Sequence, residues 1–437
     1  MDGAAATNVV VEPASRLGGH LVCPGDKSIS HRYALLGALA TGRTTITRYA
    51  TGADCSSTLK CLRTLGVTIL NQAGPDVAES IVEIDGCGLG GLSEANTSVD
   101  AGNSATTLRL LAGILAAHPF RTTLTGDPSL RRRPMDRVIK PLCAMGAQLY
   151  GEDGCPPLTI NGGTLRGIEW TTAVPSAQVK SALLFAGLHA NGKTTVRERI
   201  ATRDHTERAL ALFGIEVARS GLAVSVKGPA ALRGCAVKVP GDFSSAAGWA
   251  VAAAAIPQSK VDITDVGLNP TRTALLNVLS RAGAIVSTEL DRHADGEPCG
   301  RLTVAHRNLR PIVVSPSEVP ALIDELPLLA ALATHRGGGL TVTGASELRT
   351  KQSDRITALV AGLRALGANA TEQPDGFIIV GDRSLAGGTA NAAADHRLAI
   401  AFAVAALGAE GPSTILGADA VDVSYPGFFK TLALLRT

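Results

Sequence analysis

The chain repeats one pattern of secondary structure six times, and this repetition constrains the fold more than any other feature. Each copy has an apolar helix, a Gly-containing turn, a short Thr/Val strand, a polar loop, a second helix and a Leu-Gly-like turn into another strand. The copies begin near residues 34, 108, 181, 246, 327 and 398, at spacings of roughly 65–80 residues, the size of a supersecondary unit. An Ala/Leu-rich chain could produce such a pattern by chance, but six copies with matching turns favour a true repeat.

The two helices of each copy predict an unusual order of layers. The first helix is apolar nearly all round and is therefore expected to be buried, whereas the second has a polar surface and is expected to be more exposed. Most α/β proteins place a parallel sheet in the middle. Here we expect the reverse, an inside-out α/β barrel with buried helices and outer sheets.

A Pro-Gly-Asp sequence occurs at 24–26 and again at 240–242 and divides the six copies into two groups of three. At 437 residues the chain is also too long for one ordinary core. We therefore expect one domain over 25–241 and a second over 1–24 plus 242–437. The chain would cross between them at a hinge near 24–25 and 240–242.

Composition excludes several classes of function. The formal charge is +3 and only 3% of residues are aromatic, which argues against a nucleic-acid partner. The eight cysteines lack metal-ligand spacing, so no metal site is expected and the thiols are expected to be reduced. The start has no export signal and no apolar run is long enough to span a membrane, which predicts a cytoplasmic protein.

Cationic side chains stand where loops enter helices in the first half of the chain. In PGDKSISHR, Asp26 or Ser28 can cap a helix, and Lys27 and Arg32 lie near its N-terminus, where free N–H groups and the dipole attract anions. This is not a Walker loop, because Asp26 and not Gly precedes the lysine. Other helix entrances hold further candidates: Asn103, Ser104 and Ala105; Arg133 in SLRRRP; Ser176, Ala177 and Gln178 in VPSAQVK; and Arg203 in TRDHTE.

The second half repeats this arrangement and adds carboxylates. Asp324 and Glu325 precede a buried helix, where a carboxylate in an apolar surrounding could act as a base. The remaining candidates are Lys351 and Arg355 beside a helix capped by Ser353, and Arg397 beside a helix capped by Asp395. Each feature alone also fits a capped helix with solvated charges. Together they predict a cleft for a ligand with several phosphate or carboxylate groups.

Eight segments, taken in order, resemble the 5-enolpyruvylshikimate 3-phosphate synthase family, in the branch sometimes called class II. They are PGDKSISHR, GNSATTLR, RRRPM, SAQVKSALLFAGL, TRDHTE, IDELPLLA, LRTKQSDRI and DHRLAIAF, and they cover essentially the whole chain. The resemblance implies the enolpyruvyl transferase fold, with three βαβαββ units in each of two domains. It implies a monomer that needs no metal or organic cofactor and transfers the enolpyruvyl group of phosphoenolpyruvate to the 5-hydroxyl of shikimate 3-phosphate.

The resemblance also implies a role for each candidate residue. Shikimate 3-phosphate would be held by Lys27, Ser28, Arg32, Ser176, Ala177, Gln178, Arg203, Asp324 and Lys351. Phosphoenolpyruvate would be held by Lys27, Ala105, Arg133, Gln178, Arg355 and Arg397. Asp324 would accept the proton of the attacking hydroxyl, and Lys27 and Lys351 complete the expected catalytic set.

Two positions depart from the family pattern. Gln352 stands where the family usually has Glu, so Lys27 or Lys351 is expected to protonate the methylene carbon. Ala105 stands where Gly is common, and its methyl group predicts low sensitivity to glyphosate. Two alternatives follow: a homologue that binds ligand without turnover because of Gln352, and a UDP-N-acetylglucosamine enolpyruvyl transferase. The second usually has Lys-Asn where this chain has Lys27-Ser28.

Overall fold

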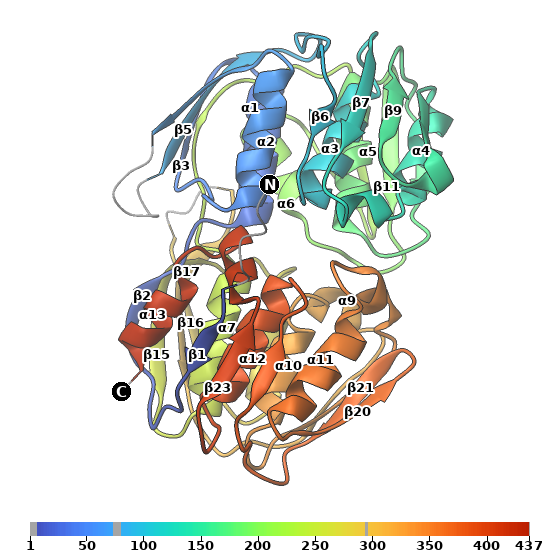
Figure 1. The fold of residues 1–437 in the computed structure, drawn as a ribbon. Helices are drawn as coiled ribbons and strands as arrows, with labels where there is room; N and C mark the ends of the chain where they lie inside the picture. Colours follow the sequence, from blue (N-terminus) through green and yellow to red (C-terminus); the bar gives the residue numbers. More distant parts are fainter. Residues whose placement is uncertain (1–6, 73–79, 293–295, 437) are drawn as a thin grey trace. The chain divides into compact units, whose positions relative to one another are not determined.

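A computed structural model describes residues 7–72, 80–292 and 296–436 (Figure 1). The first six residues, which form part of the segment searched for an export signal, lie outside these ranges. The chain divides into two compact units. Unit 2 comprises Gly25–Pro240 and a short stretch ending at Glu297, and unit 1 comprises the remainder.

Unit 2 contains three helix pairs and three four-stranded sheets among its described residues. Its helices are α1 (Lys27–Leu39), α2 (Ala53–Thr64), α3 (Ala105–Leu115), α4 (Asp136–Met145), α5 (Ala177–His189) and α6 (His205–Leu212). Its strands are β3 (Thr41–Thr47), β4 (Thr68–Gln72), β5 (Ile81–Cys87), β6 (Val99–Asp100), β7 (Arg121–Thr125), β8 (Gln148–Gly151), β9 (Leu158–Asn161), β10 (Glu169–Thr171), β11 (Gly192–Arg197), β12 (Ala218–Ser220), β13 (Ala223–Gly228) and β14 (Ala236–Lys238).

Unit 1 repeats this plan. Its helices are α7 (Phe243–Ala255), α8 (Ala274–Arg281), α9 (Val319–Leu322), α10 (Leu326–Ala333), α11 (Arg355–Ala365), α12 (His396–Ala406) and α13 (Phe428–Leu435). Its strands are β1 (Val9–Val11), β2 (Gly18–Val22), β15 (Lys260–Gly267), β16 (Ile285–Leu290), β17 (Cys299–Ala305), β18 (Ile312–Val314), β19 (Gly339–Val342), β20 (Asn369–Gln373), β21 (Gly376–Val380), β22 (Thr389–Asn391) and β23 (Ser413–Leu416). In Figure 1, β20 and β21 run along the outside of this unit while α10 and α12 lie within it.

The sheets confirm the repeat. In unit 2 the sheet orders are β14-β3-β5-β4, β6-β7-β9-β8 and β10-β11-β13-β12, and in each the first pair is parallel and the other two are antiparallel. Strand β14 follows the third repeat and pairs with β3 of the first, so the last strand of unit 2 completes the sheet of its first repeat. Unit 1 has the orders β16-β17-β15-β2, β18-β19-β21-β20 and β1-β23-β22. The six copies are therefore true structural repeats.

The helices also lie as their apolar patterns predict. Helix α5 is buried from Val179 through Leu188, and α7 is buried along most of its length. Helix α8 buries only Leu275, Val278 and Leu279. Helices α3 and α5 pack so closely that a Cβ atom on Gly113 would lie 2.2 Å from the carbonyl oxygen of Ala182, so only glycine fits there. The inside-out arrangement of helices and sheets is confirmed.

The two Pro-Gly-Asp segments lie where the division between the units falls. In unit 2 the N–H of Asp26 donates to the carbonyl of Pro240 over 2.8 Å, and in unit 1 the N–H of Asp242 donates to Pro24 over 2.7 Å. A Cβ atom on Gly25 would lie 1.9 Å from the carbonyl oxygen of Arg48. The glycine is thus required by close backbone packing directly before Lys27.

Candidate active site

In unit 2, Arg32 joins the N-terminal ends of three helices. Asp26 caps α1 by accepting the N–H of Ile29 at 2.9 Å, which places Arg32 on the second turn. The Arg32 guanidinium is buried and donates from Nε to Thr206 Oγ1 (2.7 Å) on α6 and from Nη2 to Ser181 Oγ (2.8 Å) on α5. Burial lowers its pKa to about 10, and the nearby positive charge of Arg203 acts in the same direction. Arg203 thus lies close enough to Arg32 for the two charges to interact.

Gln178 links α5 to the first turn of α3. Its Oε1 accepts from Arg109 Nη1 at 2.5 Å, and its Nε2 donates to Thr106 Oγ1 at 2.8 Å. Ala105 is the first residue of α3, and Ser176 caps α5 by accepting the N–H of Val179 at 3.4 Å. The side chains expected to contact ligand thus lie at the starts of neighbouring helices.

Lys27 is the first residue of α1 and its Nζ lies 3.1 Å from Asp54 Oδ2 on α2. The two side chains are 19% and 14% exposed, so the ion pair is shielded but reachable. Arg133 ends a single 3₁₀ turn over Leu130–Arg132 and is half-buried. Ser28 contributes its carbonyl to Arg32 Nη1 at 2.7 Å.

In unit 1 the two neighbouring carboxylates have different surroundings. Glu325 is buried and pairs with the equally buried Arg272 through two bonds of 2.6 and 2.8 Å. The Asp324 side chain keeps 17% of its surface exposed, and its Oδ1 lies 3.5 Å from Arg397 Nε. Glu325 is therefore committed to a buried ion pair, and Asp324 is the carboxylate of the two that a ligand can reach.

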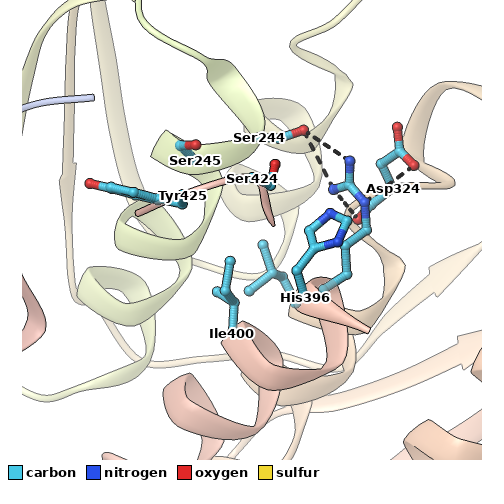
Figure 2. A pocket seen from close by; sticks show the side chains of 9 residues that line it. Ser244, Ser245, Asp324, His396, Ile400, Ser424 and Tyr425 are labelled. Atoms are coloured by element: carbon cyan, nitrogen blue, oxygen red, sulfur yellow. Dashed lines mark hydrogen bonds and ion pairs between the residues drawn. The ribbon is translucent and has the colours of Figure 1, made fainter. Parts of the chain in front are cut away.

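A small pocket adjoins Arg397 in unit 1 (Figure 2). The dashed lines from Ser244 and Asp324 mark the bonds that both residues make with the Arg397 guanidinium, at 3.4 Å to Ser244 Oγ and 3.0 Å to the Asp324 carbonyl. The remaining lining residues are Ser245, Leu328, His396, Ile400, Ser424 and Tyr425. The lining thus combines apolar side chains with the Arg397 guanidinium, hydroxyl groups and the Asp324 carboxylate.

Asp395 holds two candidate arginines together. It caps α12 by accepting the N–H of Arg397 at 2.9 Å, and its carboxylate receives Arg355 Nε at 2.6 Å and Nη2 at 3.3 Å. Burial raises the pKa of this carboxyl, but Arg355, His396 and the Arg397 N–H outweigh burial and lower the pKa to about 2. Ser353 does not cap α11 as expected. Asp354 does so, because the helix begins at Arg355 and the carboxylate directly before it accepts the N–H groups of Ile356 and Thr357.

Lys351 and Gln352 precede α11. Lys351 Nζ donates to Glu347 Oε1 at 2.8 Å. Burial lowers the pKa of Lys351, although Glu347 and Asp324 act in the opposite direction. Gln352 Nε2 donates to the carbonyl of Ala394 at 3.0 Å, so this amide fixes the loop that precedes α12.

Several residues of these clusters were not predicted from the sequence. They are Arg109, Ser181, Thr206 and Arg272, whose partners Gln178, Arg32 and Glu325 lie 53 to 174 residues away in the chain. The arginine in NPTR had no local signal that it would be buried against Glu325. Within the described ranges, no three His, Cys, Asp or Glu side chains group as a metal site would require, and no helix has the length and apolarity needed to cross a membrane.

This combination of fold and site matches known proteins. The enolpyruvyl transferase NikO from Streptomyces tendae superimposes with a TM-score of 0.77 at 17% identity, over 98% of this chain and 96% of that one, which shows a common fold. EPSP synthase from Acinetobacter baumannii superimposes with a TM-score of 0.85 at 41% identity, over 98% of both chains. The fold is therefore that of the enolpyruvyl transferases.

Sequence comparison identifies the family within this class. A sequence profile of EPSP synthase (3-phosphoshikimate 1-carboxyvinyltransferase) matches residues 11–432. The 3-phosphoshikimate 1-carboxyvinyltransferase of Lactiplantibacillus plantarum is 48% identical over 429 residues, which cover 97% of this chain and 98% of that protein. The chain belongs to the EPSP synthase family.

Proposed function

We propose that the protein transfers the enolpyruvyl group of phosphoenolpyruvate to the 5-hydroxyl of shikimate 3-phosphate and releases phosphate. The product, 5-enolpyruvylshikimate 3-phosphate, leads to chorismate and the aromatic amino acids. The observation that carries the proposal is that, in a chain of this family, candidate residues from separate repeats gather at helix N-termini within each unit. Such ends, together with arginines, favour ligands with several negative charges.

The two substrates would use overlapping sets of side chains. Shikimate 3-phosphate is assigned to Lys27, Ser28, Arg32, Ser176, Ala177, Gln178, Arg203, Asp324 and Lys351. Phosphoenolpyruvate is assigned to Lys27, Ala105, Arg133, Gln178, Arg355 and Arg397. The shared residues Lys27 and Gln178 would lie where the two ligands meet. Neither substrate calls for a metal or an organic cofactor.

Addition comes first in the proposed reaction. The 5-hydroxyl oxygen bonds to C2 of phosphoenolpyruvate while a base removes its proton and an acid protonates C3, which becomes a methyl group. Asp324 is the proposed base, because the neighbouring carboxylate, Glu325, is already neutralised by Arg272. Elimination then breaks the bond from C2 to the phosphate oxygen, and C3 returns its proton as the double bond forms again.

Lys351 or Lys27 is the proposed acid at C3. A glutamine at position 352 cannot exchange a proton with carbon, whereas a lysine with a lowered pKa donates one more readily. Burial lowers the pKa of Lys351, which supports this role. Arg355 and Arg397 would stabilise the phosphate as its charge develops during elimination.

One assay tests the proposal against its alternatives. Purified protein is incubated with phosphoenolpyruvate and either shikimate 3-phosphate or UDP-N-acetylglucosamine, and phosphate release is measured. We expect phosphate release when the acceptor is shikimate 3-phosphate and none when it is UDP-N-acetylglucosamine. Release only with the sugar nucleotide would favour the related transferase, and binding of both substrates without release would favour the inactive homologue.

Assembly and location are part of the same proposal. We infer that the enzyme acts as a monomer in the cytoplasm on small anionic substrates, without nucleic acid or membrane partners. The modest formal charge of +3 supports the absence of a polyanionic partner. Light scattering of the purified protein and fractionation of cells test these two statements.

A further inference from the structure

A chain of buried hydrogen bonds runs from α1 through α2 to the start of α3 within unit 2. His31 Nδ1 lies 2.6 Å from Thr58 Oγ1, which lies 2.6 Å from Thr107 Oγ1, and Thr107 Oγ1 donates to Ser104 Oγ at 2.7 Å. These four side chains are at most 1% exposed. Of these four hydrogen-bonded residues, only Ser104 was identified as a candidate from the sequence.

Which side chain donates in each of these hydrogen bonds follows from the single proton that each hydroxyl group carries. Thr107 uses its one hydroxyl proton on Ser104, so it must accept from Thr58. Thr58 then accepts in turn, which places a proton on His31 Nδ1. Burial lowers the pKa of His31 to about 3, so the ring is neutral and this arrangement holds at physiological pH.

Both ends of the chain lie beside residues assigned to phosphoenolpyruvate. His31 is one turn after Lys27 on α1, and Thr58 is one turn after Asp54 on α2, so the Lys27–Asp54 ion pair and the His31–Thr58 bond form two successive contacts between these helices. Ser104 caps α3 and directly precedes Ala105. Loss of one of these hydrogen bonds would therefore alter the positions of both Lys27 and Ala105.

We propose that His31, Thr58 and Thr107 are positioning residues that fix the first turn of α3 relative to Lys27 for phosphoenolpyruvate binding. This inference rests on the proposed function. Arg32, which is assigned to shikimate 3-phosphate alone, is held by a separate set of bonds to Ser181 on α5 and Thr206 on α6. Lys27 and Gln178 are assigned to both substrates, whereas Ala105, directly after Ser104, is assigned to phosphoenolpyruvate alone. Loss of the chain should therefore affect the two substrates unequally.

The test compares Thr58→Val, which keeps the shape but removes the hydroxyl, with Thr58→Ser, which keeps the hydroxyl. Thr44→Val is the matched control, because Thr44 is equally buried in unit 2 and its hydroxyl has no hydrogen-bond partner among the described residues. We expect Thr58→Val to raise the KM for phosphoenolpyruvate about tenfold, a loss of one to two hydrogen bonds. The KM for shikimate 3-phosphate should change less than about threefold, and the other two variants should resemble the wild type.

Three results would overturn this inference. Thr58→Val could leave both KM values unchanged while lowering the melting temperature, or Thr58→Ser could be as impaired as Thr58→Val. If Thr58→Val does not fold, His31→Leu and His31→Asn make the same comparison at the other side of the His31–Thr58 bond, because asparagine keeps an N–H near the Nδ1 position. Equal KM values for phosphoenolpyruvate in these two variants would then overturn the inference. A wild type with no phosphate release would instead overturn the proposed function itself.

Discussion

Replacing Asp395 with Asn removes the charge that holds Arg355, with almost no change in shape. The carboxylate is fully buried, the Arg355 side chain is 6% exposed, and the shorter of their two bonds is 2.6 Å. Asparagine can still cap α12, so the loss is confined to the ion pair. Breaking a buried pair from one side typically costs about 3–5 kcal/mol.

The pKa of Asp395 gives a second measure of the same interaction. A fall from 3.8 to about 2 corresponds to about 2.5 kcal/mol of stability from ionisation. Because the folded-state pKa is lowered, this contribution is complete above about pH 4 and disappears as the pH falls through about 2. The wild type and Asp395→Asn should therefore differ by about 3 kcal/mol at pH 7 and converge only as the pH falls through about 2.

Urea unfolding followed by circular dichroism at several pH values measures this difference. Asp85→Asn is the matched control, because Arg43 also holds Asp85 through two bonds, at 2.7 and 3.2 Å, but those side chains are 52% and 44% exposed. Its unfolding midpoint should scarcely move. Equal midpoint shifts for the two variants, or a shift for Asp395→Asn that does not shrink in acid, would refute the argument that burial makes this pair strong.

Four further substitutions test the site. Gln352→Glu should change kcat less than about tenfold if a lysine protonates the methylene carbon, and an inactive wild type rescued by this change would show that idea to be wrong. Ala105→Gly should tighten glyphosate inhibition, measured as a lower inhibition constant than in the wild type. Asp324→Asn should lower kcat by about 100-fold or more with little change in melting temperature. Glu325→Gln should instead destabilise the protein by about 3 kcal/mol, and a reversed pattern would exchange the roles of the two carboxylates.

Most of the fold could be predicted because its signal is local. An apolar helix followed by a Gly turn and a Thr/Val strand can be recognised from the residues of a single repeat, and its six copies indicate a true repeat. The helix starts were also predicted closely. Asp26, one of two expected caps, does cap α1, and Asp395 caps α12 as expected. Ser176, expected at a helix entrance, caps α5. The prediction that Ser353 caps α11 was wrong because Ser353 and Asp354 are adjacent and both are good capping residues. Only the exact first residue of α11 decides between them.

The partners of the candidate residues could not be predicted, because they are set by packing across the repeats. The sequence offers Asp324 and Glu325 as adjacent and equivalent carboxylates. Only the fold places Arg272, more than 50 positions earlier, against one of them and thereby separates a structural acid from a reachable one. Asp395 shows the same principle, since a residue recognised as a cap also fixes the side chain of Arg355 from the preceding repeat. Motifs thus indicate candidate side chains for a ligand, whereas the charge and position of each are determined by pairings between repeats that no single motif specifies.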